Sequence, residues 1–313
     1  MAIGCSSGGR RTFSPGMWTR IVDTSTERRP SGRTSRLPSS PISKPSSGGI
    51  SSFARYFPEM FQRWLRKPDL VGPVTISSRD FASESVPDGG DVRVFDNEPA
   101  LRINRARLAA IEAVGLDLTS RRVLDVGSGP GHFVDFYRSR GCDVTAIEGR
   151  PEIVSEFRRR HPDVPIYAGN VERFDFSALG RFDIVHCFGL LYHLENPIAA
   201  LRNLFDACAG VLLLETIVLD AEEPLLALAD EPKTVNQALG GIAIRPSRAF
   251  VAMALNRVGF RHVYGLSRPP SHEDFQVDWL NDRRSERDGH PIRSIFVASH
   301  HALMQPALRP LLS

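Results

Sequence analysis

Nine residues, 123–131 (VLDVGSGPG), constrain the fold of this chain more than any other stretch. Val123, Leu124 and Val126 form an apolar run typical of a buried strand, and glycine then stands at positions 127, 129 and 131. Because glycine has no Cβ, it reaches positive φ and lets a ligand lie against the backbone. The unpaired N–H groups at the start of the following helix can hold an anion such as a carboxylate. The stretch therefore predicts a strand, a ligand-binding turn and a helix in succession.

The spacing of the glycines distinguishes the dinucleotide-binding turn from other glycine-rich turns. A dinucleotide fingerprint would place its third glycine at position 132, where His132 stands. The spacing is instead G-x-G-x-G, and Asp125 lies two residues before the first glycine. The next predicted strand, 143–148 (DVTAIE), ends in Glu148. At the carboxyl edge of a parallel sheet, that carboxylate can accept both hydroxyls of a ribose, and a cap for the helix beginning at Pro151 is the alternative.

The composition predicts one globular domain that follows a polar N-terminal tail. The 313 residues are 42% hydrophobic and can bury one sizeable core, with neither a membrane-length apolar run nor a secretory signal. The four cysteines contain no C-x-x-C pair, which favours reduced thiols in the cytoplasm and no metal site. Residues 1–52 carry eight Lys or Arg and two acidic residues, so the remainder has a net charge near −3. That balance does not favour a nucleic-acid partner, and the sequence does not indicate an oligomeric state.

Three regions follow from the hydrophobic pattern. Residues 1–52 are rich in Ser, Gly, Pro and Arg without a hydrophobic period, and we predict a disordered tail. For residues 53–100 we predict an N-terminal extension that is partly helical and partly irregular. Its aromatic stretch, 53–67, favours a helix packed on the core, and a lid over the substrate pocket is the alternative. Residues 101–313 alternate helical and strand patterns and predict an α/β domain. Within it, residues 220–246 break the alternation and predict an insertion above the sheet edge.

Combined, these motifs resemble the class I S-adenosylmethionine-dependent methyltransferases, of the stand-alone bacterial type. The resemblance rests on the glycine turn, Glu148, Gly169-Asn170, and the strand FDIVHCFG followed by LLYHLENP. It implies a doubly wound Rossmann-like sheet of seven mostly parallel strands, with the antiparallel seventh between the fifth and sixth. Locally, LLYHLENP, a strand ending in Glu-Thr and the segment PSRAF also resemble the tRNA wobble-uridine carboxymethyltransferases.

The resemblance implies S-adenosyl-L-methionine as cofactor and a set of residues that bind it. Asn170 stands where the family commonly has Asp, and its amide oxygen can accept the same adenine hydrogen bond without charge assistance. A turn residue is the alternative role for Asn170. The implied cofactor-binding residues are Asp125, Gly127, Ser128, Gly129, Gly131, Glu148, Asn170, Val171, Phe188 and Gly189.

His193 is the candidate general base, because its pKa ordinarily lies near operating pH and it falls on the predicted cofactor edge. A role in shaping the loop is the alternative. Candidate substrate contacts are Tyr192, Glu215, Asn236 and Arg245.

The predicted function is methyl transfer from S-adenosylmethionine to an O or N atom of a small-molecule acceptor. Two alternatives stay open at this point. A tRNA-modifying methyl- or carboxymethyltransferase would need a basic face, and a non-catalytic cofactor-binding or scaffold protein would keep only the binding residues. The basic face would be built from the N-terminal tail together with Arg102, Arg105, Arg107, Arg158, Arg159 and Arg160.

Overall fold

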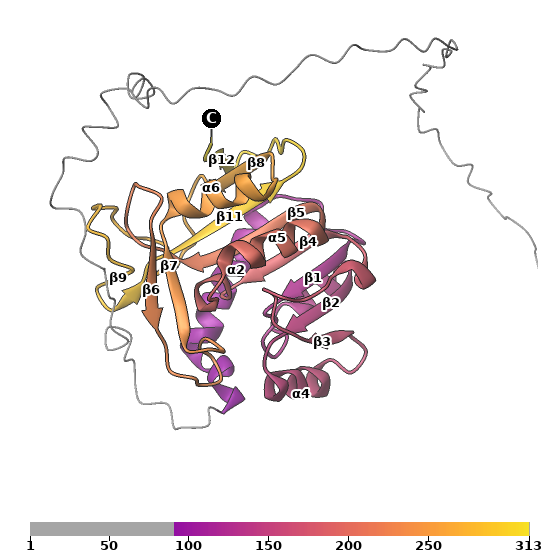
Figure 1. The fold of residues 1–313 in the computed structure, drawn as a ribbon. Coiled ribbons are helices and arrows are strands. Elements are labelled where there is room, and N and C mark those ends of the chain that lie inside the picture. Colours follow the sequence, from indigo (N-terminus) through magenta and orange to yellow (C-terminus); the bar gives the residue numbers. More distant parts are fainter. Residues whose placement is uncertain (1–90, 313) are drawn as a thin grey trace, which may run out of the picture. The chain divides into compact units, whose positions relative to one another are not determined.

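The computed structural model describes residues 91–312. Their central element is an eight-stranded sheet in the order β12-β8-β11-β5-β4-β1-β2-β3 (Figure 1). The predictions for residues 1–52 and for the helix near 53–67 lie outside the described residues. No helix within residues 91–312 is long and apolar enough to cross a membrane, and the cytoplasmic location stays a prediction.

Five parallel strands form one half of the sheet, as the alternating sequence predicts. The central strand β1 pairs on both sides: Asp125 lies opposite Ala146 in β2 and opposite His186 in β4. The strands are β1 (Arg122–Val126), β2 (Asp143–Glu148), β3 (Ile166–Ala168), β4 (Phe182–Phe188) and β5 (Cys208–Ile217).

The other half of the sheet is antiparallel. Strand β11 (Arg293–Ser299) lies between β5 and β8 (His262–Leu266) and runs antiparallel to both. This arrangement confirms the predicted doubly wound sheet with an antiparallel last strand. An eighth strand that the sequence did not predict, β12 (Leu308–Pro310), adds antiparallel to β8 at the edge.

Helices cover both faces of the sheet, and each face has its own apolar core. One core packs β4 and β5 against α5 (Pro197–Ala207) and α6 (Arg248–Val258). The opposite core packs β1 and β2 against α2 (Glu98–Val114), α3 (Val134–Arg138) and α4 (Pro151–Arg160). Helix α2 begins three residues before Leu101, where the apolar pattern of residues 101–114 predicts its start, because the Asn97 side chain accepts from the Ala100 N–H and caps it. Short 3₁₀ turns are η2 (Val92–Asp96), η3 (Ser177–Leu179) and η4 (Leu191–His193).

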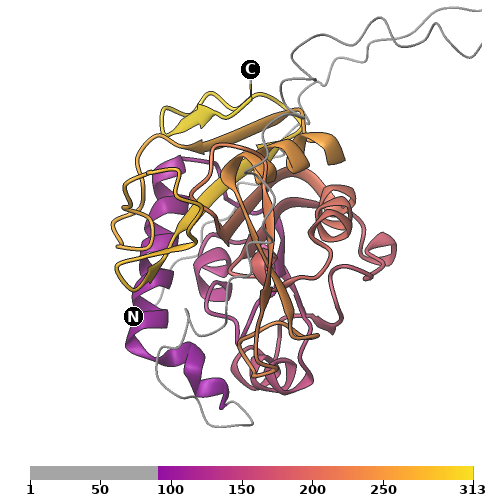
Figure 2. The same cartoon turned by 60° about the vertical axis from the view of Figure 1, so that its left-hand side comes forward.

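The insertion predicted at 220–246 contains a regular hairpin. Strands β6 (Leu226–Asp230) and β7 (Ile242–Pro246) pair antiparallel and project beside the sheet (Figure 2). A second, smaller hairpin joins β9 (Glu286–Arg287) to β10 (His290–Pro291). The β6–β7 hairpin returns the chain against η4, so that the insertion closes over the carboxyl ends of the parallel strands.

Candidate active site

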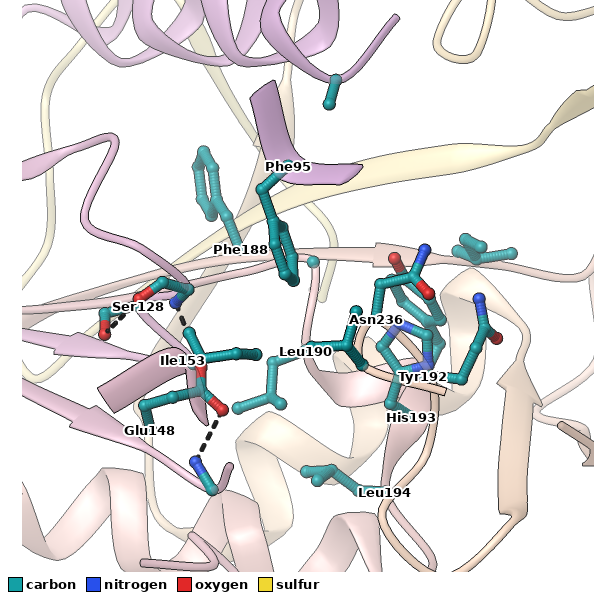
Figure 3. A pocket seen from close by; sticks show the side chains of 18 of the residues that line it. Phe95, Ser128, Glu148, Ile153, Phe188, Leu190, Tyr192, His193, Leu194 and Asn236 are labelled. Atoms are coloured by element: carbon teal, nitrogen blue, oxygen red, sulfur yellow. Dashed lines mark hydrogen bonds between the residues drawn. The ribbon is translucent and has the colours of Figure 1, made fainter. Parts of the chain in front are cut away.

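A cavity of about 1050 Å³ opens at the carboxyl ends of the parallel strands (Figure 3). Its walls come from the glycine turn after β1, the ends of β2 to β4, η2, η4 and the β6–β7 insertion. In a doubly wound sheet this edge, where the strand order reverses on either side of β1, is where ligands bind. The cavity therefore lies where the sequence motifs predict it.

The glycine turn has the backbone conformation that its sequence predicts. Gly127, Gly129 and Gly131 have φ values of +69°, +55° and +95°. Gly127 and Gly129 line the cavity, as does Ser128 between them. Gly131 does not line it, and its predicted role in cofactor binding stays a prediction. A Cβ at Gly131 would lie 2.5 Å from Cδ2 of His161, so this glycine serves the packing of the turn on α4.

Glu148 ends β2 at the cavity and holds the glycine turn in place. Its Oε2 accepts a hydrogen bond from the Gly129 N–H (3.1 Å), and its Oε1 accepts from the N–H groups of Gly149 (2.7 Å) and Arg150 (3.1 Å). Burial raises the pKa of Glu148, although the three N–H groups oppose that rise. With up to four lone-pair sites on the carboxylate, one acceptor position remains for a ligand hydroxyl.

Asp125 does not line the cavity, and its predicted role in cofactor binding stays a prediction. It is 2% exposed within β1, and its Oδ1 makes a 3.0 Å hydrogen bond with Nδ1 of His186 in the neighbouring strand. The side chain of a central strand residue is directed to one face of the sheet rather than to the strand end. Asp125 and His186 are thus a buried pair beneath the turn.

Asn170 and Val171 line the cavity at the end of β3, where the sequence predicts adenine contacts. The Asn170 Oδ1 accepts from the Glu172 N–H (2.8 Å), which is the bond of a turn residue. The structure therefore shows the alternative role of Asn170, and the adenine contact stays a prediction. Phe188 and Gly189 also line the cavity, and the Gly189 N–H donates to the Glu215 carbonyl (3.2 Å).

His193 faces the cavity from η4 and is held by a carboxylate that sequence reasoning missed. Its Nδ1 lies 2.5 Å from Oε2 of Glu231, whose Oε1 accepts from Nη2 of Arg245 (2.9 Å). Burial lowers the pKa of His193, and Glu231 opposes that shift. Burial alone would raise the pKa of Glu231, but His193 and Arg245 bring it below its ordinary value. The arrangement holds a neutral imidazole with Nδ1–H on Glu231 and leaves Nε2 as the basic nitrogen.

Glu215 does not line the cavity, contrary to its predicted substrate contact, but it places two arginines that do. It is 0% exposed and accepts from Nη2 of Arg107 (2.5 Å) and Nη1 of Arg293 (3.1 Å). Burial alone would raise the pKa of Glu215, and the two guanidinium groups reverse the shift. Arg293 also donates to Asp274 (2.9 Å) and lies 3.4 Å from the Tyr192 hydroxyl.

Tyr192, Asn236 and Arg245, the other predicted substrate contacts, all line the cavity. Tyr192 comes from η4, whereas Asn236 and Arg245 come from the insertion, so the fold brings them to His193 (Figure 3). Arg245 is buried and its Nη1 donates to the Tyr192 carbonyl (3.3 Å), which anchors the insertion to η4.

The arginines of the hypothetical basic face are largely neutralised. Arg102, Arg105 and Arg107 on α2 pair with Glu273, Glu98 and Glu215 respectively. On α4, Arg159 and Arg160 both pair with Glu156, Arg160 also pairs with Asp96, and Arg158 donates to the Ile166 carbonyl. The described residues thus do not present these side chains as a row of free charges.

Comparison with known proteins decides the family. A family model described as a methyltransferase domain matches residues 97–265, more than half of the chain. The chain belongs to this family. The predicted methyltransferase family is confirmed, and the observed sheet is the predicted Rossmann-like fold. S-adenosylmethionine as the methyl donor stays a prediction.

Individual relatives carry different names. The chain is 30% identical over 207 residues to a tRNA U34 carboxymethyltransferase of Desulforapulum autotrophicum, covering 58% of this chain and 62% of the relative. It is 35% identical over 119 residues to a ubiquinone biosynthesis O-methyltransferase of Xanthomonas oryzae pv. oryzae, covering 37% and 48%. Among solved structures, the N-terminal domain of EvdMO1, crystallised in the presence of SAH and D-fucose, has a TM-score of 0.48 and 23% identity, covering 63% and 81%. The chain thus spans less than two thirds of the length of these curated relatives.

Proposed function

We propose that this protein transfers the methyl group of S-adenosylmethionine to an oxygen or nitrogen atom of a small polar molecule, with His193 as general base. The observation that carries the proposal is the cavity that joins the glycine turn and Glu148 at one end to the His193–Glu231 pair at the other. One cavity thus combines a candidate cofactor site with a candidate base.

The cofactor end of the cavity fits the nucleoside part of S-adenosylmethionine. A Cβ at Gly129 would meet no atom closer than 3.9 Å, so the turn leaves space for a ligand there, and Glu148 retains one acceptor position for a ribose hydroxyl. Val171 and Asn170 lie beside the turn at the end of β3, where an adenine ring would be held. When bound, S-adenosylmethionine supplies a methyl group already activated by its sulfonium charge.

The acceptor end of the cavity supplies positioning and a base. Alignment of two reactants in a closed site can contribute about 7–11 kcal/mol in favourable intramolecular models, so placing the acceptor is the main task. Tyr192, Asn236 and Arg245 surround His193 and would orient a polar acceptor. The neutral imidazole takes the acceptor proton at Nε2, and Glu231 stabilises the imidazolium that forms.

A second candidate, transfer to tRNA, is favoured by the name of the 30% identical relative. The name of that relative also suggests that a carboxymethyl group is transferred in place of a methyl group. The carboxylate of such a group would need a cation beside the donor. Arg107 and Arg293 line the cavity, although both are already paired with Glu215. Labelled S-adenosylmethionine incubated separately with bulk tRNA and with a pool of small metabolites distinguishes the two acceptors.

Calorimetric titration of the full chain tests the cofactor. We expect S-adenosylmethionine and its demethylated product to bind in the micromolar range and NAD not to bind. Glu148→Ala should weaken the binding of both sulfur ligands, because it removes the ribose acceptor and the partner of the Gly129 N–H in the glycine turn and of the Gly149 and Arg150 N–H groups. Absence of binding by either sulfur ligand would refute the proposal.

A further inference from the structure

A second cavity of about 1000 Å³ lies on the antiparallel side of the sheet, away from the glycine turn. It is enclosed by the first turn of α6, strands β8, β11 and β12, and the chain between residues 265 and 281. Its apolar wall includes Ala249, Ala252, Phe275, Phe296 and Leu311. Small-molecule sites range from roughly 300 to 1000 Å³, so this space is large enough for a ligand.

Two of the three arginines that line this cavity lack the acidic partners that the third, Arg293, has. Arg248 begins α6 and Arg309 lies in the edge strand β12. Within residues 91–312, the guanidinium groups of Arg248 and Arg309 form no salt bridge and donate no hydrogen bond. Burial lowers the pKa of Arg248, and the positive charge of Arg309 lowers it further. Two like charges thus line the same cavity, where an anion bound between them would be stabilised by both.

The carboxylates of the same cavity do not supply that anion. Asp220 accepts from the N–H groups of Leu280 (2.7 Å) and Asn281 (3.1 Å) and pairs with Arg287 (2.9 Å). Glu222 and Asp278 also line the cavity, but neither forms a salt bridge with Arg248 or Arg309 in the described part of the chain. The positive charge of the arginine pair therefore remains available to a ligand.

An aromatic surface lies beside the arginine pair. The guanidinium carbon of Arg248 lies 4.6 Å from the ring centroid of Trp279, which remains 43% exposed. Exposed aromatic rings stack on planar bases with about 1–3 kcal/mol per base. An arginine pair next to an exposed indole combines the recognition of a phosphate with that of a flat ring.

We propose that this second cavity binds a nucleotide, with its phosphate between Arg248 and Arg309 and its base against Trp279. Guanidinium groups bind phosphate in bidentate geometry, and a phosphate carries enough charge and acceptor atoms for two of them. The nucleotide can be a free molecule or one unit of an RNA chain, because both present the same phosphate and base. The site does not rest on the proposed methyl transfer: Arg293 lines both cavities, but the second contains neither the glycine turn nor His193.

Calorimetric titration of the full chain with uridine monophosphate, uridine and an eight-residue oligouridylate tests the site. We expect the monophosphate to bind and uridine to bind much more weakly. Arg248→Gln and Arg309→Gln should each weaken the binding of the monophosphate by about tenfold or more, because each variant loses a hydrogen bond from a charged group. Arg257→Gln, on the same helix but outside the cavity, should leave the affinity unchanged.

Three results would overturn the proposal: absence of monophosphate binding, equal binding by uridine, or affinity unchanged in both arginine variants. Glu148→Gln alters only the first cavity and should not change the affinity for the monophosphate. A loss of affinity in this variant would assign the nucleotide to the first cavity instead. The oligouridylate identifies the source of the phosphate. An affinity well above that of the monophosphate indicates an RNA chain, and an equal affinity indicates a free nucleotide.

Thermal melting without ligand gives a second, independent readout. Because Arg248 and Arg309 repel each other in the free protein, replacing either should leave the melting temperature unchanged or raise it. A clear fall in melting temperature for both variants would show that the pair has a structural role and would contradict the proposal.

Discussion

Gly131→Ala tests the assignment of Gly131 to packing rather than to ligand contact. The new Cβ would lie 2.5 Å from Cδ2 of His161 and 3.0 Å from Cε2 of Phe157, at a φ of +95°. The left-handed backbone costs an L-residue about 1–2 kcal/mol, and overpacking costs a further 1–3 kcal/mol or so. The free energy of unfolding should therefore fall by about 2–5 kcal/mol, which for a domain of this size lowers the melting temperature by roughly 4–20 °C.

Gly289→Ala is the matched control for Gly131→Ala. Gly289 has a φ of +79°, but a Cβ there would meet nothing within 4 Å, so only the backbone cost of about 1–2 kcal/mol applies. Denaturant titration of both variants measures the difference, and His161→Ala combined with Gly131→Ala should recover part of the packing loss. Equal destabilisation by the two glycine variants would refute the packing argument.

Two further predictions concern the charged pairs of the site. Glu231→Gln should lower the pKa of His193 below its already depressed value, because it removes the carboxylate that favours the imidazolium. A histidine NMR titration measures this, with the neighbouring exposed Asp230→Asn as control, and an unchanged or raised pKa would contradict the pairing. Arg107→Met should reduce the free energy of unfolding by about 3–5 kcal/mol, because it leaves the buried Glu215 with one cation fewer. Arg105→Met, on the exposed side of the same helix, should reduce the free energy of unfolding by no more than about 1 kcal/mol in a denaturant titration. Equal losses in the two variants would show that the buried pair stabilises the fold no more than the exposed one.

Local patterns in the sequence were sufficient for the parallel half of the fold. The predicted strand 143–148 has the same bounds as β2. Pro246-Ser247 predicts a helix start, and Ser247 is the N-cap of α6. Glycines 127 and 129 likewise have the positive φ that their spacing predicts. In these cases the determining interactions lie within one element or between elements adjacent in the chain.

The charged partners of the site could not be predicted, because they come from distant parts of the chain. Glu231 meets His193 only after the β6–β7 hairpin folds back on η4, and the hairpin has no strong turn signature. Arg107 lies off the apolar stripe of α2 in the sequence pattern, yet it is buried because Glu215, 108 residues away, receives its guanidinium. Asp125 shows another limit of local patterns, since its burial and its pairing with His186, 61 residues away, are not visible in the motif.

The two edges of the main sheet have a consequence for the behaviour of the protein at high concentration. Both edge strands, β3 and β12, are only three residues long, and β12 ends in Pro310, which has no N–H to donate. An edge that offers few unpaired backbone groups is a poor template for intermolecular strand addition. The short strand β12, which caps the longer β8, thereby protects the sheet from aggregation by edge-to-edge pairing.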